Sequence, residues 1–202
     1  MNNYIITIGR ELGSGGKLLG EMLSKELNIP CYDKELIALA SKESGLGTEF
    51  FEKADEKSSH SIFGSLFGSR SGFIGDSSNN YLSNETLFKI QSDVIKNLAE
   101  KSSCIFVGRC ADYILRDNKN LLSIFVSANL DNRINTISQN NNISKTEAQT
   151  LIEQTDKKRA NYYNYFSNKT WGMAASYDLC FNSSKITMER IIEFVKPHLT
   201  KT

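Results

Sequence analysis

The stretch "YIITIGRELGSGGKLLGEMLSKEL", residues 4–27, decides the fold. A short apolar run leads into a glycine-rich loop, and the apolar residues after the loop recur at the spacing of one helix face. A strand, a glycine loop and a helix in this order are typical of a phosphate-binding loop, in which backbone N–H groups surround a phosphate at the helix N-terminus. We therefore expect a phosphate to bind at the following residues of this loop: Gly13, Ser14, Gly15, Gly16 and Lys17.

The side chains of the loop depart from the usual pattern G-x-x-x-x-G-K-S/T, which supplies a lysine for the phosphates and a hydroxyl for Mg²⁺. When Gly13–Gly15 is aligned with the glycines of that pattern, Arg10 falls on the first glycine and Gly16 on the lysine. Lys17 then falls on the hydroxyl residue. Either Lys17 or Arg10 would have to replace the lysine, and the protein ligand of a metal ion stays unknown.

Two other interpretations of the loop remain open. The dinucleotide motif G-x-G-x-x-G would need a third glycine where Leu18 stands, although Asp33 lies 20 residues after Gly13, where a ribose-binding acid is expected. Alternatively, the glycines form a tight turn between strand and helix that binds no ligand.

The rest of the chain alternates between apolar runs and helical patterns. Strands are predicted at 4–8, 104–108, 121–128 and 177–182, with a short edge strand at 29–32 that contains Pro30. Helices are predicted after the loop, at 84–101, from the capping box of Ser144 and Glu147 onward, and near the C-terminus. Continuous apolar strands alternating with helices predict an α/β fold with a five-stranded, mostly parallel sheet flanked by helices.

Composition excludes several classes of function. The chain has 202 residues and a formal net charge of +1, so it lacks the cationic excess of a nucleic-acid-binding protein. It also lacks an apolar run of roughly 18 residues that could span a membrane, and a secretion signal. The four cysteines form no C-x-x-C pair, and two histidines make a zinc site improbable. We expect a cytoplasmic protein with reduced, buried thiols that binds neither nucleic acid nor membrane; a homo-oligomer is compatible with the sequence.

Several motifs in their order along the chain resemble the cytidylate kinase-like family, relatives of the nucleoside monophosphate kinases with the P-loop NTPase fold. They are "IITIGRELGSGGK", "IPCYDKELI", "IFVGRCADYIL", "IFVSANLDNRI", "DKKRANYYNYF" and "YDLCFNSS". The resemblance covers nearly the whole chain and implies one kinase-like domain, 1–202. Residues 57–84 form a Ser/Gly-rich insertion that we expect to be mobile, and residues 144–172 a lid-like helical region.

The resemblance implies transfer of the ATP γ-phosphoryl group to a nucleoside monophosphate, with CMP as the model acceptor and Mg²⁺ as a further cofactor. Arg109 in "VGRCAD" matches the arginine that holds the acceptor phosphate, but Cys110 replaces the acid that follows it. Asp156 and Arg159 match the last acid and arginine of the lid motif, whereas its first two residues are changed. Asp33 begins the segment that binds the acceptor, although a helix N-cap would also explain it.

These matches give two sets of site residues. The candidate catalytic cations are Arg10, Lys17, Arg109, Arg133 and Arg159. The candidate substrate-binding residues are Asp33, Arg109, Asp156 and Arg159. A structural ion pair would equally explain Arg109, and a plain surface charge would explain Arg133.

A second function stays open alongside the kinase. Both loop side chains that normally act on the phosphates are changed, and loss of one such preorganised group commonly lowers a rate by about 10²–10³. The chain could therefore be a nucleotide-binding regulator, or pseudokinase, with a degenerate loop and little turnover. An acceptor other than CMP is a further alternative.

Overall fold

The computed structural model describes residues 3–33 and 84–199. Within these residues, five strands form one sheet in the order β2-β3-β1-β4-β5, and every neighbouring pair is parallel. The strands are β1 (Ile5–Arg10), β2 (Cys31–Tyr32), β3 (Cys104–Val107), β4 (Leu121–Ser127) and β5 (Leu179–Asn182). All five predicted strands are confirmed, with β2 at an edge, as Pro30 indicated.

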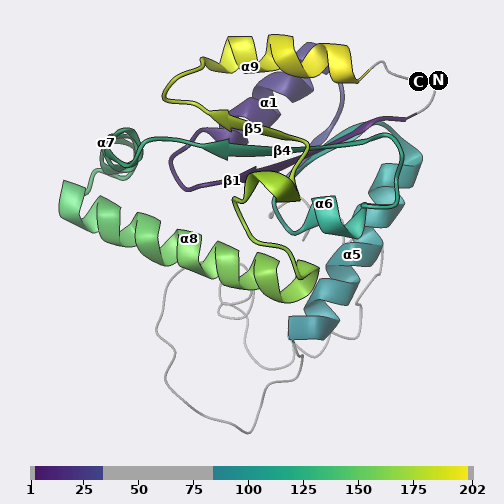
Figure 1. Ribbon diagram of the computed structural model, residues 1–202, viewed down its shortest axis with the longest axis horizontal. Helices are drawn as coiled ribbons and strands as arrows, with labels where there is room; N and C mark the ends of the chain where they lie inside the picture. Colours follow the sequence, from purple (N-terminus) through teal and green to yellow (C-terminus); the bar gives the residue numbers. More distant parts are fainter. Residues whose placement is uncertain (1–2, 34–83, 200–202) are drawn as a thin grey trace, which may run out of the picture.

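Helices cover both faces of the sheet (Figure 1). They are α1 (Gly16–Leu27), α5 (Asn84–Lys101), α6 (Ala111–Ile114), α7 (Leu130–Asn141), α8 (Lys145–Ser167) and α9 (Met188–Val195), with short 3-10 turns at Ala174–Ser176 and Lys196–His198. The capping box is confirmed, because Ser144 and Glu147 exchange both hydrogen bonds at the start of α8. The segment 57–84 lies outside the described residues except for Asn84.

The central strand β1 separates two apolar clusters, since alternate side chains of a strand point to opposite faces. Ile6 and Ile8 pack with α1 and α9 on one face, and Ile5 packs with α5 and α6 on the other. Burial on both faces explains why the strands read as continuous apolar runs. The carboxyl ends of β1, β3 and β4 consequently meet at one edge of the sheet, where the glycine loop begins.

The expectation of buried thiols is wrong for one cysteine. All four are free, and Cys104 and Cys110 are buried, but Cys180 is exposed. Cys180 lies on β5, an edge strand whose side chains alternate between exposed and buried positions, so one of its faces is left open.

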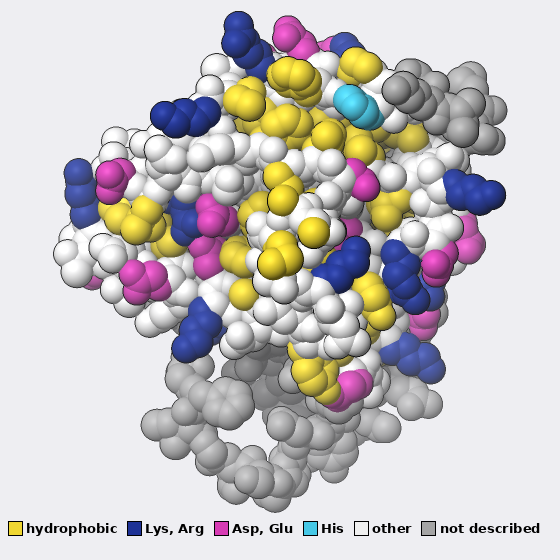
Figure 2. All heavy atoms as spheres, viewed as in Figure 1, with side chains coloured by type: hydrophobic (Ala, Val, Ile, Leu, Met, Phe, Trp, Pro, Cys, Tyr) yellow, Lys and Arg dark blue, Asp and Glu magenta, His cyan; other side chains and the backbone are white. Residues whose placement is uncertain are grey.

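Charged side chains of both signs are interspersed over the face drawn in Figure 2, and apolar side chains gather toward α9. Phe194 of α9 is 57% exposed. Within the described ranges, no helix combines the length and the apolar character needed to cross a membrane.

Candidate functional site

The glycine loop joins the end of β1 to the start of α1 and depends on residues without a Cβ. Gly13 and Gly15 have φ angles of 81° and 83°, in the left-handed region that glycine adopts without strain. A Cβ atom at residue 13 would also lie 3.0 Å from the carbonyl oxygen of Arg133. The loop therefore follows a path that only glycine permits at these two positions.

The amide N–H groups of Gly13, Gly15 and Gly16 donate to no residue in the described part of the chain. These donors lie at the N-terminus of the 12-residue helix α1, where the helix dipole favours an anion. The arrangement fits the phosphates of a nucleotide, because successive backbone N–H groups can bind several phosphate oxygens.

Ser14 belongs to the loop, but its hydroxyl turns away from this row of amides. Ser14 is buried, and its Oγ lies 2.9 Å from the carbonyl oxygens of both Glu11 and Val126. The carbonyl oxygen of Ser14 accepts a hydrogen bond from Ser183. Its side chain thus fastens the loop to the end of β4.

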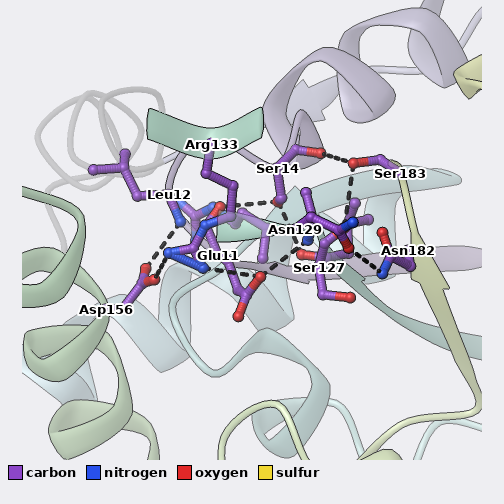
Figure 3. Close-up of polar contacts among 12 residues, drawn as sticks. Glu11, Leu12, Ser14, Ser127, Asn129, Arg133, Asp156, Asn182 and Ser183 are labelled. Carbon is purple, nitrogen blue, oxygen red and sulfur yellow. Dashed lines mark hydrogen bonds and ion pairs between the residues drawn. The ribbon is translucent and has the colours of Figure 1, made fainter. Parts of the chain in front are cut away.

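A buried ion-pair network lies behind the loop (Figure 3). Arg133 of α7 is 5% exposed and contacts the Glu11 carboxylate at 2.9 Å and the Asp156 carboxylate of α8 at 2.6 Å. Asp156 also accepts a hydrogen bond from the Leu12 amide, and Glu11 accepts one from the Ala128 amide. Two candidate site residues, Arg133 and Asp156, are therefore placed where they fix the backbone that enters the loop.

The surroundings of Asp156 act on its pKa in both directions. Burial raises the pKa of its carboxyl group, while the Leu12 amide and Arg133 act in the opposite direction. The helical spacing that groups Asp156 with Arg159 is confirmed, because both side chains face the same end of β1.

Arg159 and Arg109 approach the loop from two different elements. Arg159 of α8 donates from Nη1 to the carbonyl oxygen of Arg10 at 3.1 Å, and Arg109 follows β3. Burial lowers the pKa of Arg159, Asp156 raises it, and the nearby charges of Arg109 and Arg133 lower it further. An anion bound near both cations would be stabilised by their positive charges.

The turn that carries Arg109 has an unusual backbone. Gly108, Arg109 and Cys110 have successive φ angles of 81°, 61° and 55°. Left-handed conformations are unfavourable for residues with a Cβ and cluster at functional sites. The Arg109 guanidinium lies 5.8 Å from the centre of the Tyr162 ring, which restricts its orientation.

The side chains of Lys17 and Arg10, the two cations at the loop, contact different neighbours. Lys17 forms an ion pair with Asp33 at 2.8 Å, and its side chain is 63% exposed. Arg10 instead lies against Gly16 and Gly108, since a Cβ at either glycine would overlap the Arg10 side chain. Both carboxylate candidates, Asp33 and Asp156, are thus engaged with cations.

The protein ligand usual for Mg²⁺ does not fit this loop. Lys17 stands where the hydroxyl residue is expected, and its ammonium is directed to Asp33. Among residues 3–33 and 84–199, no group of three or more acidic, histidine or cysteine side chains could hold a metal ion. Phosphate binding by the amides is therefore supported by the geometry, whereas direct coordination of a metal by the loop is not.

A second polar cluster lies beside Arg109 and was not predicted as part of the site. The Tyr163 hydroxyl donates to Asp112 at 2.7 Å, and burial raises the pKa of Asp112. The Tyr177 hydroxyl is buried and has no hydrogen-bond partner among the described residues. The sequence held only one signal for this cluster, the displaced acid Asp112 in "VGRCAD".

Residues 5–185 match the model of the cytidylate kinase-like family. The chain belongs to this family. It is therefore a nucleotide-binding, kinase-like protein, and its structure has the P-loop fold. No curated protein matches the chain in sequence.

Solved structures agree with this fold. An uncharacterized protein from Eubacterium ventriosum superposes with a TM-score of 0.74 at 25% identity, over 99% of this chain and 100% of that one. Shikimate kinase from Bacteroides thetaiotaomicron gives 0.53 at 17% identity, over 98% and 99% of the two chains. Shikimate kinase from Acinetobacter baumannii, in complex with shikimate, gives 0.50 at 9% identity, over 99% and 97%. The shikimate kinases share the fold, and their low identity carries nothing about the acceptor.

Proposed function

We propose that this cytidylate kinase-like protein transfers the γ-phosphoryl group of ATP to a nucleoside monophosphate, with CMP as the first acceptor to test. The observation that carries the proposal is the row of amide donors at Gly13, Gly15 and Gly16, at the N-terminus of α1 and beside several arginines. We further propose that the reaction takes place in the cytoplasm.

On the donor side, these amides would hold the phosphate chain of ATP. ATP supplies the transferable phosphoryl group, and the chain contributes position and positive charge. The Glu11–Arg133–Asp156 network supports this role indirectly, because it fixes the residues that precede Gly13. Mg²⁺ would be bound by phosphate oxygens and water, since the loop lacks its usual hydroxyl ligand.

On the acceptor side, Arg109 is the residue suited to the phosphate of the monophosphate. A guanidinium meets two phosphate oxygens at once, and the left-handed turn at Arg109 together with Tyr162 restricts its orientation. Burial lowers the pKa of Arg159, and the charge of Arg109 lowers it further. Phosphate groups between these arginines would be stabilised by both.

The alternative is a nucleotide-binding regulator that turns over little substrate. Two observations favour it: Lys17 replaces the metal-binding hydroxyl, and Cys110 replaces the acid after Arg109. Neither change removes the amide donors, so nucleotide binding is expected under both hypotheses.

Purified protein should be incubated with ATP and Mg²⁺ and, separately, with CMP, UMP, AMP, GMP or shikimate, while ADP formation is measured. ADP that depends on a monophosphate, with the highest kcat/KM for CMP, supports the proposal. ATP binding by calorimetry without ADP formation would support the regulator instead. Turnover with shikimate alone would contradict a nucleotide acceptor.

An arginine pair provides a matched test of the acceptor site. Arg109→Met should raise the KM for the monophosphate by about tenfold or more, because it removes a charge-assisted contact. Arg116→Met serves as control, since Arg116 is a surface residue that lies over the Tyr113 ring. An equal KM for both variants would exclude Arg109 from acceptor binding.

A further inference from the structure

The loop contains an exchange of residue types between two positions six residues apart in the motif. Arg10 stands where the motif G-x-x-x-x-G-K has its first glycine, and Gly16 stands where it has its lysine. Relative to the motif, the glycine and the cationic residue are therefore interchanged. The structure shows where the side chain of Arg10 goes as a result.

The stem of Arg10 fills the space beside Gly16. A Cβ added at Gly16 would overlap the Cβ of Arg10 and would lie 2.9 Å from its Cγ. A lysine at residue 16 would therefore begin its side chain in the volume that the Arg10 stem already occupies. The two side chains exclude each other, so only one of the two positions can carry the cation.

The guanidinium end of Arg10 reaches the carboxyl end of β3. A Cβ at Gly108 would overlap Nη1 of Arg10, and Gly108 has a left-handed φ of 81°. Arg10 hence extends from the glycine loop to the turn that presents Arg109. Its backbone carbonyl also accepts the hydrogen bond from Arg159. The charge of Arg10 therefore lies between the glycine loop and Arg109, the residue assigned to the acceptor phosphate.

The competing cation lies elsewhere. Lys17 is directed to Asp33 near the end of β2; the Lys17 side chain is 63% exposed and the Asp33 side chain 16%. Lys17 is thus held toward Asp33, whereas the stem of Arg10 lies directly beside Gly16 of the loop.

From these contacts we propose that Arg10 contacts the nucleotide phosphates in place of the loop lysine, and that the glycines at 16 and 108 make room for it. The role of Arg10 in catalysis rests on the proposed phosphotransferase function. Its contact with the phosphates rests on nucleotide binding alone. An arginine also suits a bridge between two phosphates, because its planar guanidinium can donate to both.

Single variants test the assignment. Arg10→Met keeps the stem and removes the charge, and it should lower kcat by about 10²–10³. Arg10→Lys should retain more activity than Arg10→Met, and the surface control Arg116→Met should stay within about twofold of wild type. A loss on Lys17→Met as large as that on Arg10→Met would overturn the assignment, as would full activity of Arg10→Met.

The exchange can also be reversed. Arg10→Gly combined with Gly16→Lys restores G-x-x-x-x-G-K over residues 10–16. Gly16→Lys alone should be impaired, because the new side chain collides with Arg10. The double variant should recover activity by about tenfold or more over Arg10→Gly. Circular dichroism confirms that each variant is folded, and a double variant no better than Arg10→Gly would count against the proposal.

The inference and the proposed function fail in different ways. If wild type binds ATP but forms no ADP, the phosphotransferase fails, and the Kd of ATP becomes the readout for Arg10. Arg10→Met should then raise this Kd by about tenfold, and Gly16→Lys with Arg10→Gly should lower it again. Unchanged affinity of Arg10→Met would overturn the role of Arg10, and a wild-type chain that binds no nucleoside triphosphate would overturn both.

Discussion

Replacing Arg133 with Met should destabilise the protein far more than loss of a surface ion pair. The Arg133 side chain is 7% exposed and contacts two carboxylates, those of Glu11 at 2.9 Å and Asp156 at 2.6 Å. Its removal leaves the two acids without the cation that joins them. Breaking a buried ion pair in this way costs ~3–5 kcal/mol. Because Glu11 is 25% exposed and can regain water, we expect the lower part of this range.

Urea denaturation followed by far-UV circular dichroism measures this loss. In a thermal melt, a loss of about 3–4 kcal/mol should lower the Tm by about 6–16 °C for a chain of this length. Lys196→Met is the matched control, since its ion pair with Glu26 is roughly half exposed and exposed ion pairs contribute little to stability. Combining Arg133→Met with Asp156→Asn should recover part of the loss, because one stranded charge is removed. An Arg133→Met loss no larger than that of Lys196→Met would refute the reasoning.

Three further predictions follow from single contacts. Gly13→Ala should cost about 1–2 kcal/mol of stability and weaken ATP binding in calorimetry, because φ is 81° and the new Cβ meets a carbonyl oxygen; unchanged affinity would contradict this. Burial raises the pKa of Asp112, so its charge costs stability as pH rises above the ordinary value of 3.8. The Tm of Asp112→Asn relative to wild type should therefore increase between about pH 4 and pH 8, and a constant difference would be inconsistent with it. Exposed Cys180 should react first with a thiol reagent at about pH 8, as read by mass spectrometry, because burial raises the pKa of Cys104 to about 12; earlier labelling of Cys104 would be the opposite result.

The strands were predictable because the residues within each strand indicate by themselves that the strand is buried. Runs such as 4–8 and 104–108 are continuously apolar, since parallel strands are covered on both faces. The edge strand β5 shows the limit of this rule. The apolar residues of β5 predicted a buried Cys180, but on this edge strand the Cys180 side chain is exposed. Edge position depends on strand order, which no local pattern contains.

The candidate site likewise contains features that the sequence predicts and features that depend on distant residues. The row of amide donors follows from neighbouring glycines, because positive φ angles and a helix N-terminus are local properties. The partners of Arg133 were not predictable, since Asp156 lies 23 positions along the chain in another helix. The cluster of Asp112 with Tyr163 likewise joins two elements that are 51 positions apart.

By itself, the sequence determined that a glycine loop joins a buried strand to a helix. It predicted that this loop binds phosphate and that Arg10 or Lys17 would have to replace the lysine of the motif. The tertiary structure decided how these two cations lie. Because β3 pairs with β1, Gly108 lies beside the end of β1 and leaves space for the Arg10 side chain, while Asp33 after β2 engages Lys17. The backbone conformation of a loop is encoded in adjacent residues, whereas the direction of a long side chain depends on neighbours that only the packing of distant strands provides.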